Sequence, residues 1–185
     1  MENSQSNTYL SRMVRAAKLD VTLYEEVKRD RNAFAQAMGV VILSSLCAGV
    51  SGIAKEEGAL ALILLSTVGA LVGWYLWALL TYFIGTRFLP EPQTRSDYGQ
   101  LLRTIGFSSA PGILRIFGLI PGLTMVVFFL SFIWMLVAMV IAVRVALDYT
   151  STLRALGVCA AGWLVQAILL MLLLALSGGL PMIPT

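Results

Sequence analysis

The chain has 185 residues, of which 58% are hydrophobic and only 12% are charged, and its formal net charge is +3. Soluble domains carry about 25% charged residues, so this composition excludes an ordinary soluble protein and predicts an all-α integral membrane protein. The chain has no histidine, which excludes imidazole-based catalysis and metal binding. We therefore expect no catalytic residue, no cofactor and no metal site, and the modest positive charge favours a membrane surface over nucleic acid as a partner.

Residues 1–33 are polar and form a predicted cytoplasmic segment with a short amphipathic helix. Residues 9–18 have helical spacing, with Arg12, Arg15 and Lys18 away from the apolar face. This pattern predicts a helix that lies on an anionic membrane surface through these three cations. An equally good interpretation is a helix packed against the cytoplasmic side of the protein itself.

A second short helix is predicted to end at Val27. Thr22 and Glu25 have the spacing of a capping box at its start. We interpret the charged run of residues 25–29 as a solvated face. No apolar stretch precedes Phe34, so we expect the first hydrophobic segment to be retained rather than removed as a signal peptide.

Five apolar segments follow and define a predicted membrane domain over residues 34–185. A helix that spans the membrane needs about 20 apolar residues. The third segment is short and is interrupted by Pro111, Gly112 and Gly118. The five segments are residues 34–54, 58–85, 104–120, 123–147 and 153–176.

The basic residues predict the orientation of these segments. With five crossings and a cytoplasmic N-terminus, only Lys55 and Arg115 lie in or toward the outer side, so the C-terminus is expected outside. If the third segment were re-entrant, Arg144 and Arg154 would move outside and the bias would weaken. The eleven cations on the predicted cytoplasmic side are Arg12, Arg15, Lys18, Lys28, Arg29, Arg31, Arg87, Arg95, Arg103, Arg144 and Arg154.

One sequence pattern occurs at the start of the first, third and fifth segments. In each copy an Asp is followed nine residues later by a Gly, and the two clear copies have an Arg between them at the sixth position. The clear copies contain Asp97, Arg103 and Gly106, and Asp148, Arg154 and Gly157; the fainter copy contains Asp30 and Gly39.

The aspartates of this pattern have two interpretations. A carboxylate near the start of a helix can accept free backbone N–H groups and meet the positive end of the helix dipole. Alternatively, each Arg shares a helix face with its Gly, so Arg103 could pair with Asp148 and Arg154 with Asp97. Those pairs would tie the third segment to the fifth, and the glycines would let the helices approach closely.

Two further features lie inside the predicted spans. Arg115 is a candidate contact for a lipid or another ligand, because an arginine at membrane depth is costly and often functional; snorkelling to the outer interface is the alternative. Gly69 and Gly73 form a small-xxx-small pair, which predicts a close helix contact within the subunit or with a second one. Cys47 and Cys159 both lie in apolar runs and are expected to be unlinked.

Three stretches resemble the Yip family, the Ypt/Rab-interacting five-span membrane proteins. They are Leu-Arg-Thr-Ile-Gly-Phe-Ser-Ser-Ala-Pro at residues 102–111, the Ile-Trp, Ala-Val-Arg and Thr-Leu-Arg-Ala-Leu elements within residues 133–156, and Leu-Tyr-Glu-Glu-Val at residues 23–27 with Asp30. The resemblance covers about residues 20–176. It implies a five-span protein of the compact prokaryotic branch, located in the cytoplasmic membrane. The Asp-Leu-Tyr-Gly-Pro element of the eukaryotic trafficking members is not matched, so GTPase binding is not carried over.

These observations predict a non-enzymatic membrane scaffold or accessory subunit of a membrane assembly. Its expected partners are membrane lipids and other membrane proteins, or a second copy through self-association. The alternative is a small transporter, channel or lipid-handling protein with a path near Arg115. The scarcity of charges inside the membrane favours the first function, whereas the second requires a polar cavity.

Overall fold

The computed structural model describes residues 8–53 and 57–176 of the chain, and every regular element in these ranges is helical. η2 is a π-helical turn that prolongs α4, and η3 is a 3-10 helix. In chain order the elements are α1 (Tyr9–Ala17), α2 (Val21–Arg29), α3 (Ala33–Ile53), α4 (Ala59–Phe83), η2 (Ile84–Phe88), α5 (Tyr98–Phe107), η3 (Ala110–Leu119), α6 (Thr124–Ala146) and α7 (Thr152–Leu176).

Four of the described helical stretches are long and apolar enough to cross a membrane. Lipid offers no partner to backbone polar groups, so a long apolar run must satisfy its hydrogen bonds within one helix. The structure confirms the prediction of an all-helical chain with several helices of membrane-spanning length. These stretches are Ala33–Gly52, Ala59–Phe88, Thr124–Ala146 and Thr152–Leu169.

The third predicted segment, residues 104–120, is not one continuous helix. α5 begins earlier than predicted, because Asp97 and Gln100 form a capping box at its start, and η3 follows it as a tighter helix. Pro111 is at the beginning of η3. An N–H group at this position would have no acceptor within the helix, so its absence in proline costs no hydrogen bond. A 3-10 helix rises about 2 Å per residue, so η3 covers about 20 Å.

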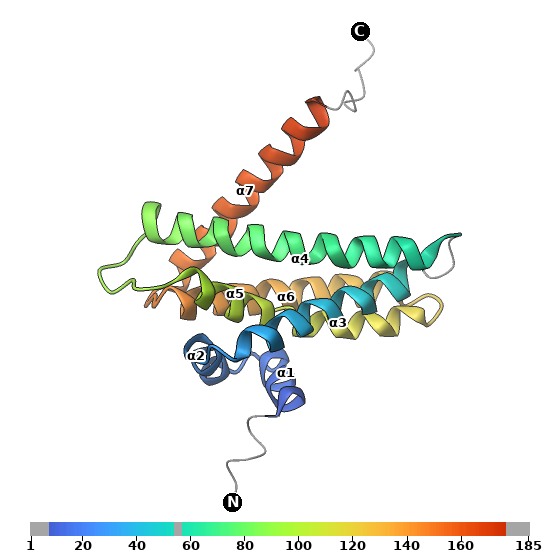
Figure 1. Cartoon of the computed structure of the whole chain (residues 1–185), viewed down its shortest axis with the longest axis horizontal. Coiled ribbons are helices and arrows are strands. Elements are labelled where there is room, and N and C mark those ends of the chain that lie inside the picture. Colours follow the sequence, from blue (N-terminus) through green and yellow to red (C-terminus); the bar gives the residue numbers. More distant parts are fainter. Residues whose placement is uncertain (1–7, 54–56, 177–185) are drawn as a thin grey trace, which may run out of the picture.

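The helices form a bundle in which the third segment runs along α3 (Figure 1). α3, α5 and α7 begin at one end of the bundle, and α4 with η2 and α6 finish there. η3 ends at the opposite end, where residues 121–123 turn the chain into α6. α7 starts beside η2 and then slopes away from the rest of the bundle, so that most of its side chains are exposed.

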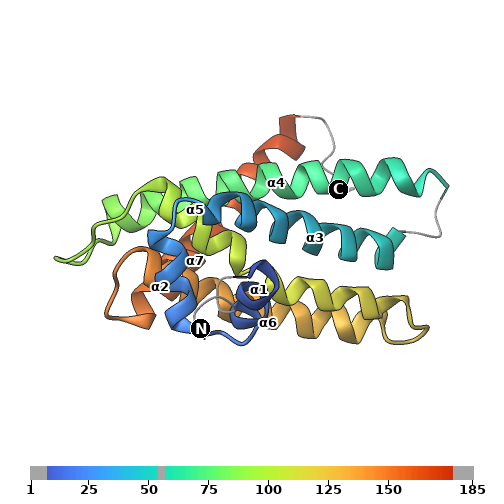
Figure 2. The ribbon, with the colours of Figure 1, turned by 60° about the horizontal axis from the view of Figure 1, so that its bottom comes forward.

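α1 and α2 pack against one flank of the bundle, near the end at which α3 begins (Figure 2). α2 contacts α5 and α6, and α1 contacts η3. The side chain of Trp134 on α6 donates a hydrogen bond of 2.8 Å to the carbonyl of Ala17, at the end of α1. The polar N-terminal segment is therefore held by the bundle itself.

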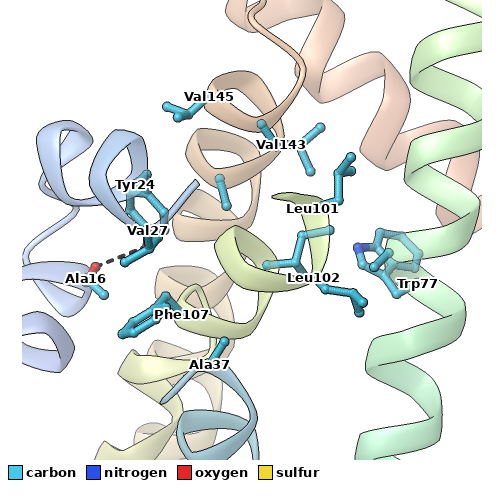
Figure 3. Packing of buried hydrophobic residues seen from close by; sticks show 14 of the residues in the cluster. Ala16, Tyr24, Val27, Ala37, Trp77, Leu101, Leu102, Phe107, Val143 and Val145 are labelled. Atoms are coloured by element: carbon cyan, nitrogen blue, oxygen red, sulfur yellow. Dashed lines mark hydrogen bonds between the residues drawn. The ribbon is translucent and has the colours of Figure 1, made fainter. Parts of the chain in front are cut away.

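The buried core joins α2 to the longer helices (Figure 3). Tyr24 and Val27 of α2 are fully buried, together with Leu101 and Phe107 of α5 and apolar side chains of α6. The Tyr24 hydroxyl donates to the Ala16 carbonyl at 3.3 Å. Burial of each large apolar side chain contributes roughly 1.5–3 kcal/mol to stability, so this core fixes α2 firmly.

Candidate functional site

A seam of small residues joins α3 to α5 and η3. Three glycines spaced six residues apart face three small residues of α3 spaced seven apart. Within η3, the six residues from Gly112 to Gly118 rise about as far as seven residues of the α-helix α3. A Cβ atom at Gly106 would lie 2.7 Å from the Ala37 Cβ, and one at Gly118 would lie 3.2 Å from the Ser51 Cβ. The three pairs are Gly106 with Ala37, Gly112 with Ser44, and Gly118 with Ser51.

The other glycines singled out from the sequence have different surroundings. Gly39 faces α1, where an added Cβ would lie 2.9 Å from the Tyr9 hydroxyl. Gly157 has only an ordinary contact at 3.8 Å with a leucine of the α4–α5 connection. Gly69 and Gly73 have no described atom within 4 Å of an added Cβ. The close contact predicted for this pair is therefore not made within the described part of the subunit.

Arg12 is the centre of an ion-pair cluster between α1 and α2. Its guanidinium lies 2.7 Å from Glu26 and 2.9 Å from Asp30, and it donates to Gln36 at 2.9 Å. Its side chain is only 6% exposed. Arg15 also pairs with Glu26, at 2.8 Å. The prediction that these two cations face a membrane surface is therefore wrong, because α2 supplies their counter-charges; the alternative, a helix packed against the protein itself, describes the structure.

The N-cap of α2 is Asp20, two residues before the predicted Thr22. Its carboxylate accepts the Thr22 N–H at 2.9 Å and the Arg15 guanidinium at 2.8 Å. The predicted capping box of Thr22 with Glu25 is wrong, because a charged carboxylate upstream takes the free N–H. Burial alone would raise the pKa of Asp20, but the bonds from Thr22 and Arg15 lower it to about 2. Lys18 remains exposed in the turn before it.

Arg103 and Asp148 do not pair with each other. Arg103 donates through Nε to the Val27 carbonyl at 2.9 Å and through Nη2 to the Lys28 carbonyl at 2.5 Å, so it caps the C-terminal end of α2. Asp148 accepts instead from the Lys28 ammonium at 2.5 Å. The predicted pair of Arg103 with Asp148 is wrong because α2 lies against α5 and α6. Groups of α2 bind both Arg103 and Asp148. Lys28 is correspondingly buried rather than solvated.

Arg154 and Asp97 also have separate partners. Arg154 lies 3.6 Å from Glu91, in the α4–α5 connection, whereas Asp97 caps α5. The predicted pair of Arg154 with Asp97 is therefore wrong as well. Capping by the aspartates holds for Asp97 but not for Asp148, which adopts a left-handed turn with φ of 56°. The first free N–H groups of α7 face Ser151, whose hydroxyl accepts from the Arg154 N–H at 3.4 Å.

Glu91 is a key residue that the sequence analysis did not single out. Its carboxylate accepts the Thr150 N–H at 3.0 Å, the Thr150 hydroxyl at 2.8 Å and the Ser151 N–H at 3.3 Å. These bonds, with that from the Thr150 backbone first, lower the pKa of Glu91. Together they tie the α4–α5 connection to the α6–α7 connection. Its only sequence signal is a lone acid between two prolines, which names no partner.

Arg115 lies in η3 with its side chain half-buried. Its Nε atom is buried and has no hydrogen-bond partner among the described residues. The guanidinium carbon lies 5.4 Å from the centre of the Phe128 ring, a cation–π contact. Its backbone carbonyl accepts from the Ser51 hydroxyl at 2.5 Å, which fixes this turn of η3 on α3.

The Arg115 side chain lines a cavity of about 320 Å³ between the long helices and η3. The lining includes hydroxyl and amide groups from Ser44, Ser109 and Gln166, but no acidic side chain of the described residues. Arg115 is thus one of the residues that line this cavity, and its role as a contact for a lipid or another ligand stays a prediction. The polar groups around it were not found from the sequence, because single serines and a glutamine in apolar runs carry no spacing signal.

The described residues offer little for metal or redox chemistry. Within residues 8–53 and 57–176, no three His, Cys, Asp or Glu side chains are placed to hold a metal ion. Cys47 and Cys159 are both free and buried. The chemistry of the site thus rests on cations, hydroxyls and apolar surface.

The fold and these features are those of an integral membrane protein, with helices long and apolar enough to cross a membrane and a cavity that Arg115 lines. The sequence model of the Yip1 domain matches residues 24–174. The chain therefore belongs to the Yip1 domain family, as its resemblance predicted. Neither a curated protein nor a solved structure matches the chain.

Proposed function

We propose that this Yip-type protein is non-enzymatic and acts as a scaffold or accessory subunit of a membrane assembly, which it joins through helix contacts with a second copy of the chain. The observation that carries the proposal is the open face of α4 at Gly69 and Gly73, where no described atom lies within 4 Å of an added Cβ. The absence of histidine from the sequence supports the non-enzymatic part.

The physics of helix association in lipid supports a partner at this face. Lipid tails are as apolar as leucine, so helices associate there mainly by close packing, which small residues allow. Gly69 and Gly73 are four residues apart and share a face, the spacing typical of symmetric helix dimers. Leu62 and Leu65, two turns and one turn before Gly69 on the same face of α4, are 44% and 69% exposed. A second copy would cover both the glycines and these leucines.

The proposed topology has five crossings, with residues 1–33 and the N-terminus in the cytoplasm and the C-terminus outside. Its support is that α3, α5 and α7 begin at one end of the bundle, where the predicted cytoplasmic cations cluster. α5 and η3 together would form the third crossing. A helix of irregular geometry is tolerated at membrane depth where other parts of the protein cover it. α3 covers η3 in this way, along the seam of small residues. We place the protein in a prokaryotic cytoplasmic membrane.

Glycine replacement tests the assembly proposal. In a mild detergent, the wild-type protein should elute as a dimer by light scattering, and the Gly69→Leu/Gly73→Leu variant should elute as a monomer. Ala61→Leu, at an exposed small residue of the same helix, is the matched control and should stay dimeric. A monomeric wild type, or a dimer that tolerates both leucines, would refute the proposed contact.

Lipid handling is a second candidate function, and one specific observation favours it. Arg115 lines a cavity together with hydroxyl and amide groups, and no acidic side chain of the described residues lines it, which supports this function. Reconstituted vesicles test this function: the protein should speed the exchange of a fluorescent acidic lipid between leaflets, and Arg115→Met should not. Exchange at the protein-free rate would reject it.

A further inference from the structure

We infer that the Arg115 cavity and an adjoining apolar groove form one binding site for an acidic amphiphile, a molecule with one anionic head group and one long apolar chain. Arg115 binds the head group and the groove between α4 and α7 binds the chain. The inference shares with the second candidate function, lipid handling, only the location of the ligand at Arg115. It requires no transport, because a bound amphiphile can also serve as a fixed part of the fold.

The head-group half of the site is a cation for which the described residues supply no counter-charge. The Arg115 Nε is buried and unpaired among the described residues, and Phe128 occupies one face of the guanidinium. A cation in a region of low dielectric is costly unless it is paired. The planar guanidinium matches carboxylate and phosphate oxygens in a bidentate geometry, so an anion is the ligand that satisfies it best.

Neutral polar groups surround the same space and can complete the binding of the head group. Ser44 on α3, Ser109 before η3 and Gln166 on α7 all line the cavity with Arg115. Hydroxyl and amide groups donate hydrogen bonds to anion oxygens that the arginine leaves free. No described carboxylate lines the cavity, so nothing charged competes with the ligand for Arg115.

The chain half of the site is a groove of about 620 Å³ on the lipid-facing side of α4 and α7. Both spaces are of the size at which proteins bind small ligands. Gly73, Trp77 and Gln166 line the groove and also the cavity, so the two spaces adjoin. Because Gly73 has no side chain, the passage at this position stays open. The remaining groove residues are apolar: Leu76, Leu79, Leu80, Phe83 and Leu169.

This combination selects the class of ligand. A free inorganic anion would pair with Arg115 but leave the groove empty, and a neutral lipid would fill the groove but leave the cation unpaired. Only a molecule with both parts satisfies both halves. The groove lies on the outer surface of the bundle, where Leu76 and Leu169 are more than half exposed, so a ligand can enter sideways from the bilayer.

Tryptophan fluorescence offers a direct binding assay. Trp77 lines both the groove and the cavity, so a fatty acid with bromine atoms on the chain bound in the groove should quench the emission of this tryptophan. The probe is dibromostearate, added to the purified protein in a neutral detergent. Unbrominated oleate and lysophosphatidate should reverse the quenching, whereas inorganic phosphate and monoolein should not. Reversal by oleate but not by lysophosphatidate would identify a carboxylate head group, whereas reversal at a lower concentration of lysophosphatidate than of oleate would identify a phosphate.

Two pairs of variants decide the inference. Arg115→Met should weaken dibromostearate binding about tenfold or more, since a hydrogen-bonded charge is lost, and Arg115→Lys should retain most of the affinity. Gly73→Leu should weaken binding by closing the passage, whereas Gly69→Leu, which lines neither space, should not. Equal affinity in the wild type and Arg115→Met, or equal competition by monoolein and oleate, would overturn the inference.

The same variants separate this inference from the proposed functions. Both glycine variants should impair the dimer, but only Gly73→Leu should impair ligand binding. Loss of the dimer with normal quenching in Gly69→Leu therefore supports both proposals independently. Quenching without lipid exchange would reject lipid handling and leave the binding site standing.

Discussion

Lys28 on α2 and Asp148 after α6 form an ion pair across 120 residues of sequence. The Lys28 ammonium lies 2.5 Å from the Asp148 carboxylate and also donates to the Val145 carbonyl at 3.0 Å. The lysine side chain is 7% exposed and that of the aspartate is 38% exposed. The pair fastens the N-terminal helices to the end of the bundle where α6 finishes.

Asp148→Asn should lower the free energy of unfolding by roughly 1–2 kcal/mol, because the buried Lys28 ammonium loses its counter-charge while the aspartate is partly exposed. Asn accepts positive φ, so the backbone of the turn is not disturbed. Denaturant titration followed by circular dichroism in detergent measures the change. Glu25→Gln is the control, since its exposed pair with Arg29 should contribute under about 0.5 kcal/mol. Equal losses in the two variants would contradict this role of Asp148.

Arg12→Glu should detach α1 from the bundle. The variant places a third carboxylate beside Glu26 and Asp30, and the loss of a buried pair of this kind costs roughly 3 kcal/mol. Backbone amides of α1 should therefore exchange hydrogen at least about tenfold faster than in the wild type. Lys18→Glu reverses an exposed charge in the turn directly after α1 and should change exchange far less. If both reversals had the same effect, the internal role of Arg12 would be refuted.

The contact of α1 with α2 should weaken in acid in a way that depends on Asp20. The folded pKa of Asp20, about 2, lies below the ordinary value of 3.8. Its contribution to stability is therefore present above about pH 4 and is lost as the pH falls toward 2. Asp20→Asn should show a smaller loss of stability than the wild type between about pH 4 and pH 2. Identical pH profiles would show that Asp20 is not a source of this dependence.

The long helices could be predicted from the sequence because each is an uninterrupted apolar run. Pro111 and Gly112 predicted that the third segment is broken, but not that it becomes a 3-10 helix. In that conformation, Gly112 and Gly118 of η3 lie against the small side chains of Ser44 and Ser51 on α3. The sequence alone does not indicate which helix is the neighbour.

The charged partners could not be predicted for a related reason. Residue spacing tells which side chains share a helix face, but it does not tell what lies opposite. Arg103 is in α5 and Asp148 is in the turn after α6, yet groups of α2 bind both of them. Arg115 was recognisable from its depth in an apolar segment, whereas the cavity beside it is formed by helices distant in sequence.

Cysteine labelling should establish the five-crossing topology. In a chain with Cys47 and Cys159 replaced by serine, single cysteines at Gln93 and Thr150 should react only with reagents supplied from the cytoplasm. Cysteines at Glu56 and Thr185, which lie outside the described residues, should react only from outside. Thr150 is the decisive position, since labelling there from outside would mean that the third segment does not cross.

Photo-crosslinking in native membranes tests most directly whether the protein acts through helix contacts with a second copy. A photo-reactive amino acid at Leu65, one turn before Gly69, should give a product with the mass of two chains, and Met125 on α6, which is 85% exposed, provides the control position. The Leu65 product should form, Met125 should give none, and the Gly69→Leu/Gly73→Leu variant should lose the Leu65 product. If Leu65 gives no two-chain product, or gives one that the leucines do not affect, the helix contact between two copies is refuted.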